Sequence, residues 1–552
     1  MQRNQAATRS DVGQQPKIIS ILGQPCPPVR HRTAGQGNPP RDACGLARAI
    51  CVVAGFLTLA FATATSAQEM RARSVLEQAA EAMGGLERLQ DLDNLVLTGF
   101  GQRLYYQGGG NITGDAKAPP KWQSIVDVQR SFDLQGERAI YQERWAQEFP
   151  FAGFFGLNFA RNSALQTGGA LLDHPLAALL EALDAETRFG AVSTEDGTIV
   201  VQFTAEGATS PAWIGIDPVT HLPRFTRWIA PSVNLGDLTT TAWFTGYTPV
   251  EGVQLPMGLM HELNWRDQVS LMFQVDSYRI DVPAAQLPAF PAPSAAPATG
   301  TAPSAQVTSV GAGVWDVRVG TAGGPVIEFA DRLVMFEAYG GEAQTLARID
   351  AANALVPGKE VEAVIVSHHH FDHTGGLRAA ISRGLEVISQ RGNEGIIREM
   401  VERPAIHYPD TLAKNPHPLV FTPVDDKLVL EDATQRLEIY RVVEHSHMPD
   451  AVFAYLPKER LMMEGDLGDE AWQLHWWGSA LAANIAHYGI DPERNIAVHG
   501  TGPLSIEQTL ANNRRQIEAA VEYCRTTEQG GRFVFGCPAQ YDTRGPVTLR
   551  PR

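Results

Sequence analysis

Residues 367–376 read SHHHFDHTGG, and this stretch decides the fold of the C-terminal half of the chain. It follows VEAVIV (361–366), an apolar and partly β-branched run that is typical of a buried strand. Alternate side chains of an extended chain share a face, so we expect His368 and His370 to point one way and His369 the other. The two glycines that close the stretch are expected to let the backbone turn sharply into a helix.

The order of the polar residues in this stretch indicates a metal site. Eleven of the fifteen histidines of the chain lie between positions 368 and 499. Asp372 and His373 come where the strand is expected to turn, which predicts two adjacent ligand sets on one short loop. Imidazole nitrogens together with a carboxylate are ligands that Zn²⁺ prefers.

Three later segments each offer a further ligand. HSHMPDAVFAYLP (445–457) contains two candidate histidines before an apolar run, RLMMEGDL (460–467) ends in Gly-Asp, and NIAVHGTGP (495–503) places a histidine after a short apolar run. His447 is favoured over His445 as the ligand of the first segment, and both stay candidates.

The stretch from His368 to His373 resembles the signature of the metallo-β-lactamase superfamily, and the resemblance spans about residues 310–525. It implies an α/β fold, the four-layer αββα sandwich, with two zinc ions. The implied ligands of the first ion are His368, His370 and His447. Those of the second are Asp372, His373 and His499, with Asp466 between the two ions.

The resemblance also implies a mechanism, in which a metal-bound hydroxide attacks a carbonyl or phosphoryl centre. Asp372 is the expected catalytic residue, because it can bind metal and orient the nucleophile. One departure is Glu337, which stands where many members of the superfamily carry an aspartate; it either orients ligands by hydrogen bonding or is simply a charged strand end. The residues expected to support the ligands without binding metal are Glu337, His369, His445 and Asp450.

The remaining chain divides by composition. An apolar run after basic residues, closed by small residues, is typical of a cleaved secretory signal and predicts a periplasmic or secreted protein; an uncleaved membrane anchor is the alternative. A Pro/Ala-rich stretch predicts a linker between two folded regions. The expected segments are a disordered extension (1–48), the signal (49–67), an antiparallel β-rich domain with helices (70–282), the linker (283–306), the metallo-β-lactamase-like domain (307–525) and a tail (526–552).

Two further observations bear on the β-rich domain and the C-terminus. The succession of alternating strands in 70–282 weakly resembles periplasmic carriers of the lipoprotein-carrier type, which form open half-barrels. Cys524 and Cys537 are expected either to form a disulfide in an oxidising compartment or to stay two separate thiols.

His475, which lies in the aromatic segment WQLHWWGS, is expected either to shape a substrate pocket or to pack in a loop.

Charge narrows the substrate class. Removing the seven basic and two acidic residues of positions 1–67 leaves 38 basic and 59 acidic residues, a net charge of −21. Such a chain repels phosphate backbones, so nucleic acid is not an expected partner. The sequence predicts an exported zinc-dependent hydrolase of a small ester, lactone, thioester or amide. The alternatives are a hydrophobic-ligand binding protein with an accessory metal domain, and a β-lactamase.

Overall fold

The computed structural model describes residues 67–106, 108–147, 162–290, 303–443, 445, 447–468 and 477–529. All of these lie in one compact unit, Thr65–Arg552. The expected extension, the signal segment up to residue 66, the middle of the linker, His475 and the side chains of Cys524 and Cys537 lie outside the described residues. Within the part of the chain that is described, no helix combines the length and the apolar character needed to cross a membrane.

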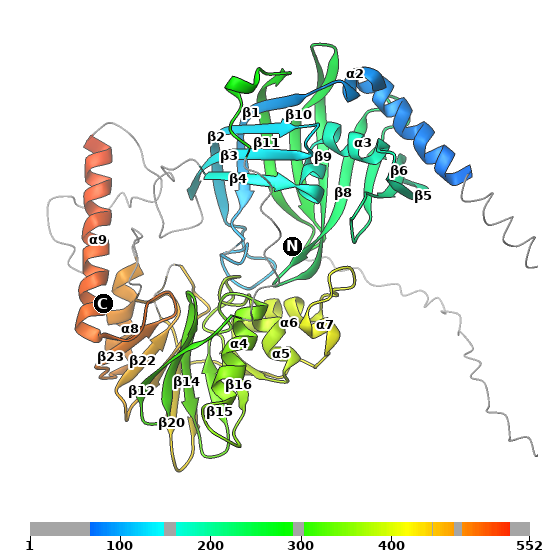
Figure 1. Cartoon of the computed structure of the whole chain (residues 1–552). Coiled ribbons are helices and arrows are strands. Elements are labelled where there is room, and N and C mark those ends of the chain that lie inside the picture. Colours follow the sequence, from blue (N-terminus) through cyan, green and yellow to red (C-terminus); the bar gives the residue numbers. More distant parts are fainter. Residues whose placement is uncertain are drawn as a thin grey trace, which may run out of the picture. The chain divides into compact units, whose positions relative to one another are not determined.

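The N-terminal region is built on one eleven-stranded sheet in which every pair of neighbours is antiparallel. Its strands, in spatial order, are β4 (Asn162–Thr167), β3 (Arg138–Gln147), β2 (Trp122–Asp133), β1 (Asn94–Leu104), β11 (Gln268–Ile280), β10 (Val253–Leu263), β9 (Gly236–Val250), β8 (Pro223–Ser232), β7 (Ala212–Ile216), β6 (Thr198–Thr204) and β5 (Arg188–Glu195). The sheet is strongly curved (Figure 1).

Helices cover one face of this sheet. A helix over residues 67–83, α2 (Leu86–Gln90) and α3 (Pro175–Leu183) contribute apolar side chains to the same cluster as the strands. Leu76 and Leu179 are fully buried there beside Phe132 and Phe203. The expected antiparallel β-rich architecture with helices is therefore confirmed.

The C-terminal region has two sheets. The seven-stranded sheet is ordered β12 (Gln306–Gly311), β13 (Val314–Val319), β14 (Ala322–Glu328), β15 (Leu333–Phe336), β16 (Val361–Ile365), β17 (Glu386–Gln390) and β18 (Phe421–Val424). The six-stranded sheet is ordered β19 (Lys427–Glu431), β20 (Arg436–Arg441), β21 (Val452–Leu456), β22 (Leu461–Glu464), β23 (Arg494–Ala497) and β24 (Leu504–Ser505). Helices follow the strands as α4 (Glu342–Asn353), α5 (Leu377–Ser382), α6 (Glu394–Glu402), α7 (Thr411–Lys414), α8 (Ala480–Tyr488) and α9 (Ile506–Gln529).

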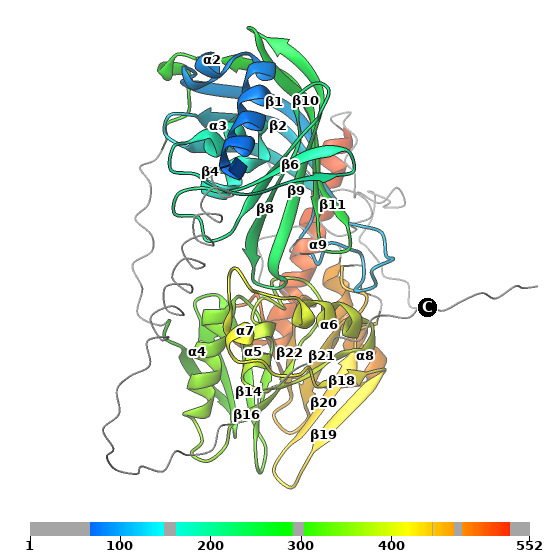
Figure 2. The ribbon, with the colours of Figure 1, turned by 90° about the vertical axis from the view of Figure 1, so that its right-hand side faces the viewer.

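Strand alternation explains the layers. In β15, Leu333 and Met335 face the cluster shared with the helices α4 to α6, whereas Val334 and Phe336 face the cluster between the two sheets. In β21 the alternate residue Phe453 faces a third cluster, which includes α8. Because successive side chains of a strand point to opposite faces, both faces of each sheet can pack against an apolar layer. The result is helix, sheet, sheet, helix, as Figure 2 shows for α4, the strands and α8, and it confirms the predicted four-layer sandwich.

Candidate metal centre

The histidine-rich loop begins at the end of β16, in the seven-stranded sheet. Gly376 caps α5 at its N-terminus, and neither it nor Gly375 has a positive φ. These glycines are needed for close approach: a Cβ on Gly375 would collide with the carbonyl oxygen of Gly340, and one on Gly376 with Oγ1 of Thr345. The loop is therefore pressed against the start of α4, which fixes the directions of its histidines.

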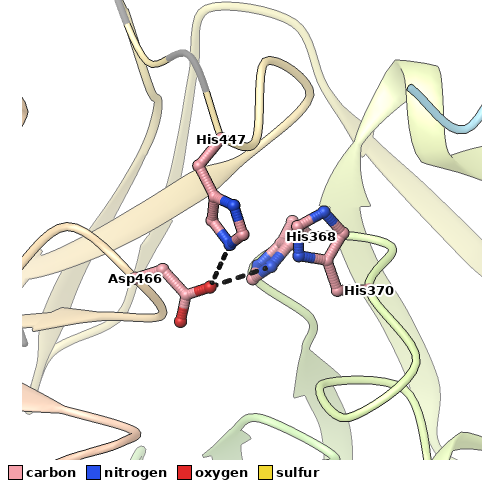
Figure 3. A group of neighbouring side chains, drawn as sticks. All are labelled: His368, His370, His447 and Asp466. Atoms are coloured by element: carbon pink, nitrogen blue, oxygen red, sulfur yellow. Dashed lines mark hydrogen bonds and ion pairs between the residues drawn. The ribbon is translucent and has the colours of Figure 1, made fainter. Parts of the chain in front are cut away.

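One group of potential ligands contains His368, His370, His447 and Asp466, all buried (Figure 3). Asp466 Oδ2 lies 2.9 Å from His447 Nε2 and 3.4 Å from His368 Nε2. The rings of His370 and His447 are 4.6 Å apart, so the third imidazole faces the same point. Three elements far apart in the sequence thus deliver these four side chains.

A second group contains Asp372, His373 and His499. Asp466 turns its other oxygen to this group: Oδ1 lies 3.1 Å from His373 Nε2 and 3.3 Å from His499 Nε2. Asp372 Oδ2 is 3.3 Å from His499 Nε2. Asp466 therefore lies between the groups, where the resemblance placed it.

The donor atoms fit divalent metal ions. Ligand atoms about 2.0–2.1 Å from one ion in a tetrahedral arrangement lie about 3.3 Å from each other. The nitrogen-to-oxygen distances within the two groups run from 2.9 to 3.4 Å, with His373 Nε2 to Asp372 Oδ2 at 3.6 Å. The structure brings together all seven residues predicted as ligands, and their role in binding metal stays a prediction.

The pKa values of the histidines are shifted in opposite directions in the two groups. Burial lowers the pKa of His368 to about 3, and it lowers the pKa values of His370 and His447 as well. In the second group, the surrounding carboxylates outweigh burial and raise the pKa of His373 well above its usual value, and that of His499 also rises. At neutral pH the three imidazoles of the first group are neutral, the form that binds metal, and they lie beside the carboxylate of Asp466.

Glu337 supports the centre from the end of β15. Its side chain is fully buried, with Oε1 accepting from the backbone N–H of Ser367 at 3.0 Å and lying 3.4 Å from His373 Nδ1. The backbone has a positive φ of 70°, and Arg348 holds it by donating to the Glu337 carbonyl at 2.7 Å. A buried carboxylate behind a ligand histidine fixes the ring orientation. Glu337 is thus buried and in contact with the histidine loop, and its role in orienting His373 stays a prediction.

We expect Glu337→Gln to weaken metal binding about 10- to 100-fold, because the amide no longer supplies the charge that orients and polarises His373. Competition with a chromophoric chelator measures the change. Glu328→Gln, on a half-buried glutamate paired with Lys359, is the matched control and should leave affinity unchanged. Equal metal affinity in Glu337→Gln and the wild type would contradict the assigned role.

The other predicted supporting residues have different positions. The ring of His369 lies against Gly109 in the β-rich region and edge-on to the ring of His370, with ring centres 5.0 Å apart. His445 accepts from the backbone N–H groups of His447 and Met448 through Nδ1, so it shapes the ligand loop. Asp450 has its carboxylate against Gly392, and none of its described contacts reaches a ligand histidine.

Sequence reasoning missed a set of residues from distant segments. Lys121 Nζ lies 2.9 Å from His370 Nε2, and burial lowers the pKa of this lysine to about 7. Asn234 donates to the Phe371 carbonyl at 3.0 Å and to Thr374 Oγ1 at 2.8 Å. Both come from the β-rich region, in stretches that carry no motif.

Tyr339 is another residue that the motifs did not identify. Its hydroxyl is 3.3 Å from His499 Nδ1, and its ring lies edge-on to the rings of His373 and His499. The ring covers the second group on one side. Alternation along a strand could not have identified it, because β15 ends at Phe336 and the backbone of Glu337 has a positive φ.

One family model matches part of the chain. Residues 326–467 match the model of the metallo-β-lactamase superfamily, which confirms the predicted resemblance for the C-terminal region. No curated protein matches the chain. Similar solved structures include metallo-β-lactamases from Pontibacter korlensis (16% identity, TM-score 0.30, 39% of this chain and 99% of that chain) and Hirschia baltica (19%, 0.29, 39% and 97%), and DIM-1 metallo-β-lactamase (15%, 0.31, 40% and 99%).

Proposed function

Residues 326–467 form a metallo-β-lactamase superfamily domain, and from this premise we propose that the protein is an exported, zinc-dependent hydrolase of small carbonyl substrates. The observation that supports it best is the pair of ligand groups that share Asp466. Each group has at least three potential ligands, and none of the seven expected positions has been lost. A protein that only binds an apolar ligand has no use for such an arrangement.

Divalent ions bound in these groups would supply an activated water nucleophile and electrostatic stabilisation of the developing oxyanion. The side chains of the protein would accept the proton and limit the access of water. Asp372 lies 3.3 Å from His499 and keeps a carboxylate oxygen beside the second group, where it can accept a proton from the attacking water. Tyr339 and the buried loop of residues 367–374 restrict the access of bulk water.

Lys121 adds a positive group on the side of His370. An ammonium at this position can stabilise negative charge on the substrate as the carbonyl is attacked. The β-rich region therefore contributes to the site in addition to the seven metal ligands.

The decisive experiment combines metal analysis with substrate screening of the chain from residue 68 to 552. We expect about two zinc ions per chain and hydrolysis of at least one class among chromogenic esters, lactones, thioesters and amides. A strong chelator should abolish the activity, and the double variant His368→Ala/Asp372→Ala should lower kcat/KM at least about 10³-fold.

The matched control for that experiment is His417→Ala, because His417 is exposed and lies outside both groups. It should keep both metal ions and full activity. Wild-type rates in the double variant would refute the proposal, and so would a purified chain that binds no zinc. Faster hydrolysis of β-lactams than of any other class would make the protein a β-lactamase.

A further inference from the structure

The curved sheet of the β-rich region encloses a cavity of about 650 Å³ between β1, β2, β3, β4 and β11. Its lining combines aromatic and aliphatic side chains, among them Tyr105, Tyr141, Trp145, Ile125 and Leu271, with an equal number of polar or charged ones. A volume of this size, with aromatic walls and polar groups that can orient a ligand, is typical of small-molecule sites.

Two arginines reach this cavity, and they differ in their partners. Arg130 forms ion pairs with Glu143 at 3.2 Å and with Asp173 at 3.1 Å. Arg103 donates only to the neutral Gln123 at 3.0 Å and stacks 3.3 Å above the centre of the Trp145 ring. Among the described residues, no carboxylate oxygen lies within ion-pair distance of Arg103.

A cation in this position is poorly solvated. Burial lowers the pKa of Arg103 to about 10, although Glu143 at longer range raises it. A guanidinium without a counter-ion in an apolar cavity costs free energy that a ligand carboxylate can offset with two parallel hydrogen bonds. Both carboxylates of the cavity pair with Arg130, so Arg103 offers one positive charge, which matches a singly charged ligand better than a dianionic phosphate.

Two paired segments of backbone run from the cavity wall toward the metal centre. Arg103 is paired with Gln123 across β1 and β2, and the backbone N–H of Tyr105 donates to the carbonyl of Lys121 at 2.9 Å, two residues further along. Residues two apart on a strand share a face and are separated by about 7 Å. Lys121 then reaches His370 at 2.9 Å. Arg103 and His370 therefore lie at the two ends of one short stretch of paired backbone, of which Arg103, Tyr105 and Gln123 line the cavity.

We propose that this cavity is the substrate-binding site of the enzyme, and that it takes an amphiphilic monocarboxylate whose carboxylate pairs with Arg103 while its apolar body fills the sheet. The hydrolysed group is then held at the opposite end, beside Lys121 and the metal ligands. The description of the ligand as a substrate, and the position of its hydrolysed group, rest on the proposed function. The binding site itself is independent of hydrolysis.

Binding is tested on the metal-free protein, where hydrolysis plays no part. Dodecanoate is titrated calorimetrically and by Trp fluorescence, because Trp145 lies against Arg103; dodecanol is the neutral probe of equal length. We expect saturable binding of dodecanoate, and binding of dodecanol about 10- to 100-fold weaker, the range of one charge-assisted hydrogen-bonded pair. Equal affinity for the two probes would overturn the proposal without any variant.

Variants locate the site. Arg103→Met should lower the affinity for dodecanoate about 10- to 100-fold and leave the affinity for dodecanol unchanged, and Arg103→Lys should lower the affinity for dodecanoate less. Arg188→Met, on the exposed edge strand β5, is the control and should bind both probes as the wild type does. Circular dichroism and thermal melting check the fold of each protein. Unchanged dodecanoate affinity in a folded Arg103→Met protein would place the carboxylate elsewhere and refute the assignment.

Turnover separates this proposal from the hydrolase proposal. With the zinc-loaded protein, Arg103→Met should raise KM for the p-nitrophenyl monoester of suberic acid about 10- to 100-fold with little change in kcat, and leave p-nitrophenyl octanoate unaffected. Equal KM changes for both esters would contradict the site. Selective dodecanoate binding in a protein that hydrolyses no ester or other acyl substrate would sustain the site and refute the hydrolase.

Discussion

Replacing Asp466 by alanine is expected to lower kcat/KM at least about 10³-fold and to reduce the zinc content from two ions per chain to one or none. The reason is its position: one carboxylate oxygen faces His447 and His368, and the other faces His373 and His499. Its removal therefore takes a ligand from both groups at once. It also leaves four imidazoles without the negative charge that they face.

Metal content measured by plasma emission spectrometry gives a readout that does not depend on the substrate. Asp425→Asn is the matched control, because Asp425 is an exposed carboxylate paired with Arg391 on the surface. That variant should keep two ions. If Asp466→Ala retained two ions with wild-type affinity, the two groups would not share this carboxylate as the geometry indicates.

The sequence was sufficient for the parts of the centre that depend on local spacing. Alternation along a strand separated His368 and His370 from His369, and the structure has His369 facing Gly109 while the other two face Asp466 and His447. The four-layer fold was predicted through the resemblance of the histidine stretch to the superfamily, and the apolar residues of β21, which face two different clusters, fit it.

The contribution of the β-rich region could not be read from the sequence. Lys121 and Asn234 are single polar residues within ordinary strand and turn patterns, 249 positions before His370 in the first case. Their roles depend on a tertiary contact that places Trp265 against Phe371, with ring centres 5.5 Å apart. No local spacing encodes such a contact, whereas a cluster of ligands on one loop does leave a local pattern.

The pH dependence of metal binding is expected to differ between the two groups. His373 has a pKa raised well above 6.5 by Asp466, Asp372 and Glu337, so in the metal-free protein it holds a proton at neutral pH. A metal ion must displace that proton, because only the neutral imidazole is a ligand. Affinity at the second group should therefore fall about tenfold for each unit by which pH is lowered, or about 100-fold from pH 8 to pH 6.

The first group should respond much less over the same range. Burial lowers the pKa values of His368, His370 and His447, so these rings have fewer protons to lose on binding metal than His373 has. Lys121 adds a smaller dependence, since its pKa of about 7 means that an ammonium opposes a cation beside His370 at lower pH. In Lys121→Met this contribution should vanish and the first affinity should become nearly constant.

Titration of the metal-free protein with zinc at pH 6, 7 and 8, in buffers of different ionisation enthalpy, measures both the affinities and the protons released. In Lys121→Met we expect the zinc ion that binds at the second group to release about one proton or more. The ion that binds at the first group should release close to none. Glu337→Gln removes one of the carboxylates that hold the proton on His373, so it should reduce the slope at the second group. Equal slopes at both groups in Lys121→Met would mean that the carboxylates around His373 do not hold its proton, and the electrostatic difference between the groups would then be wrong.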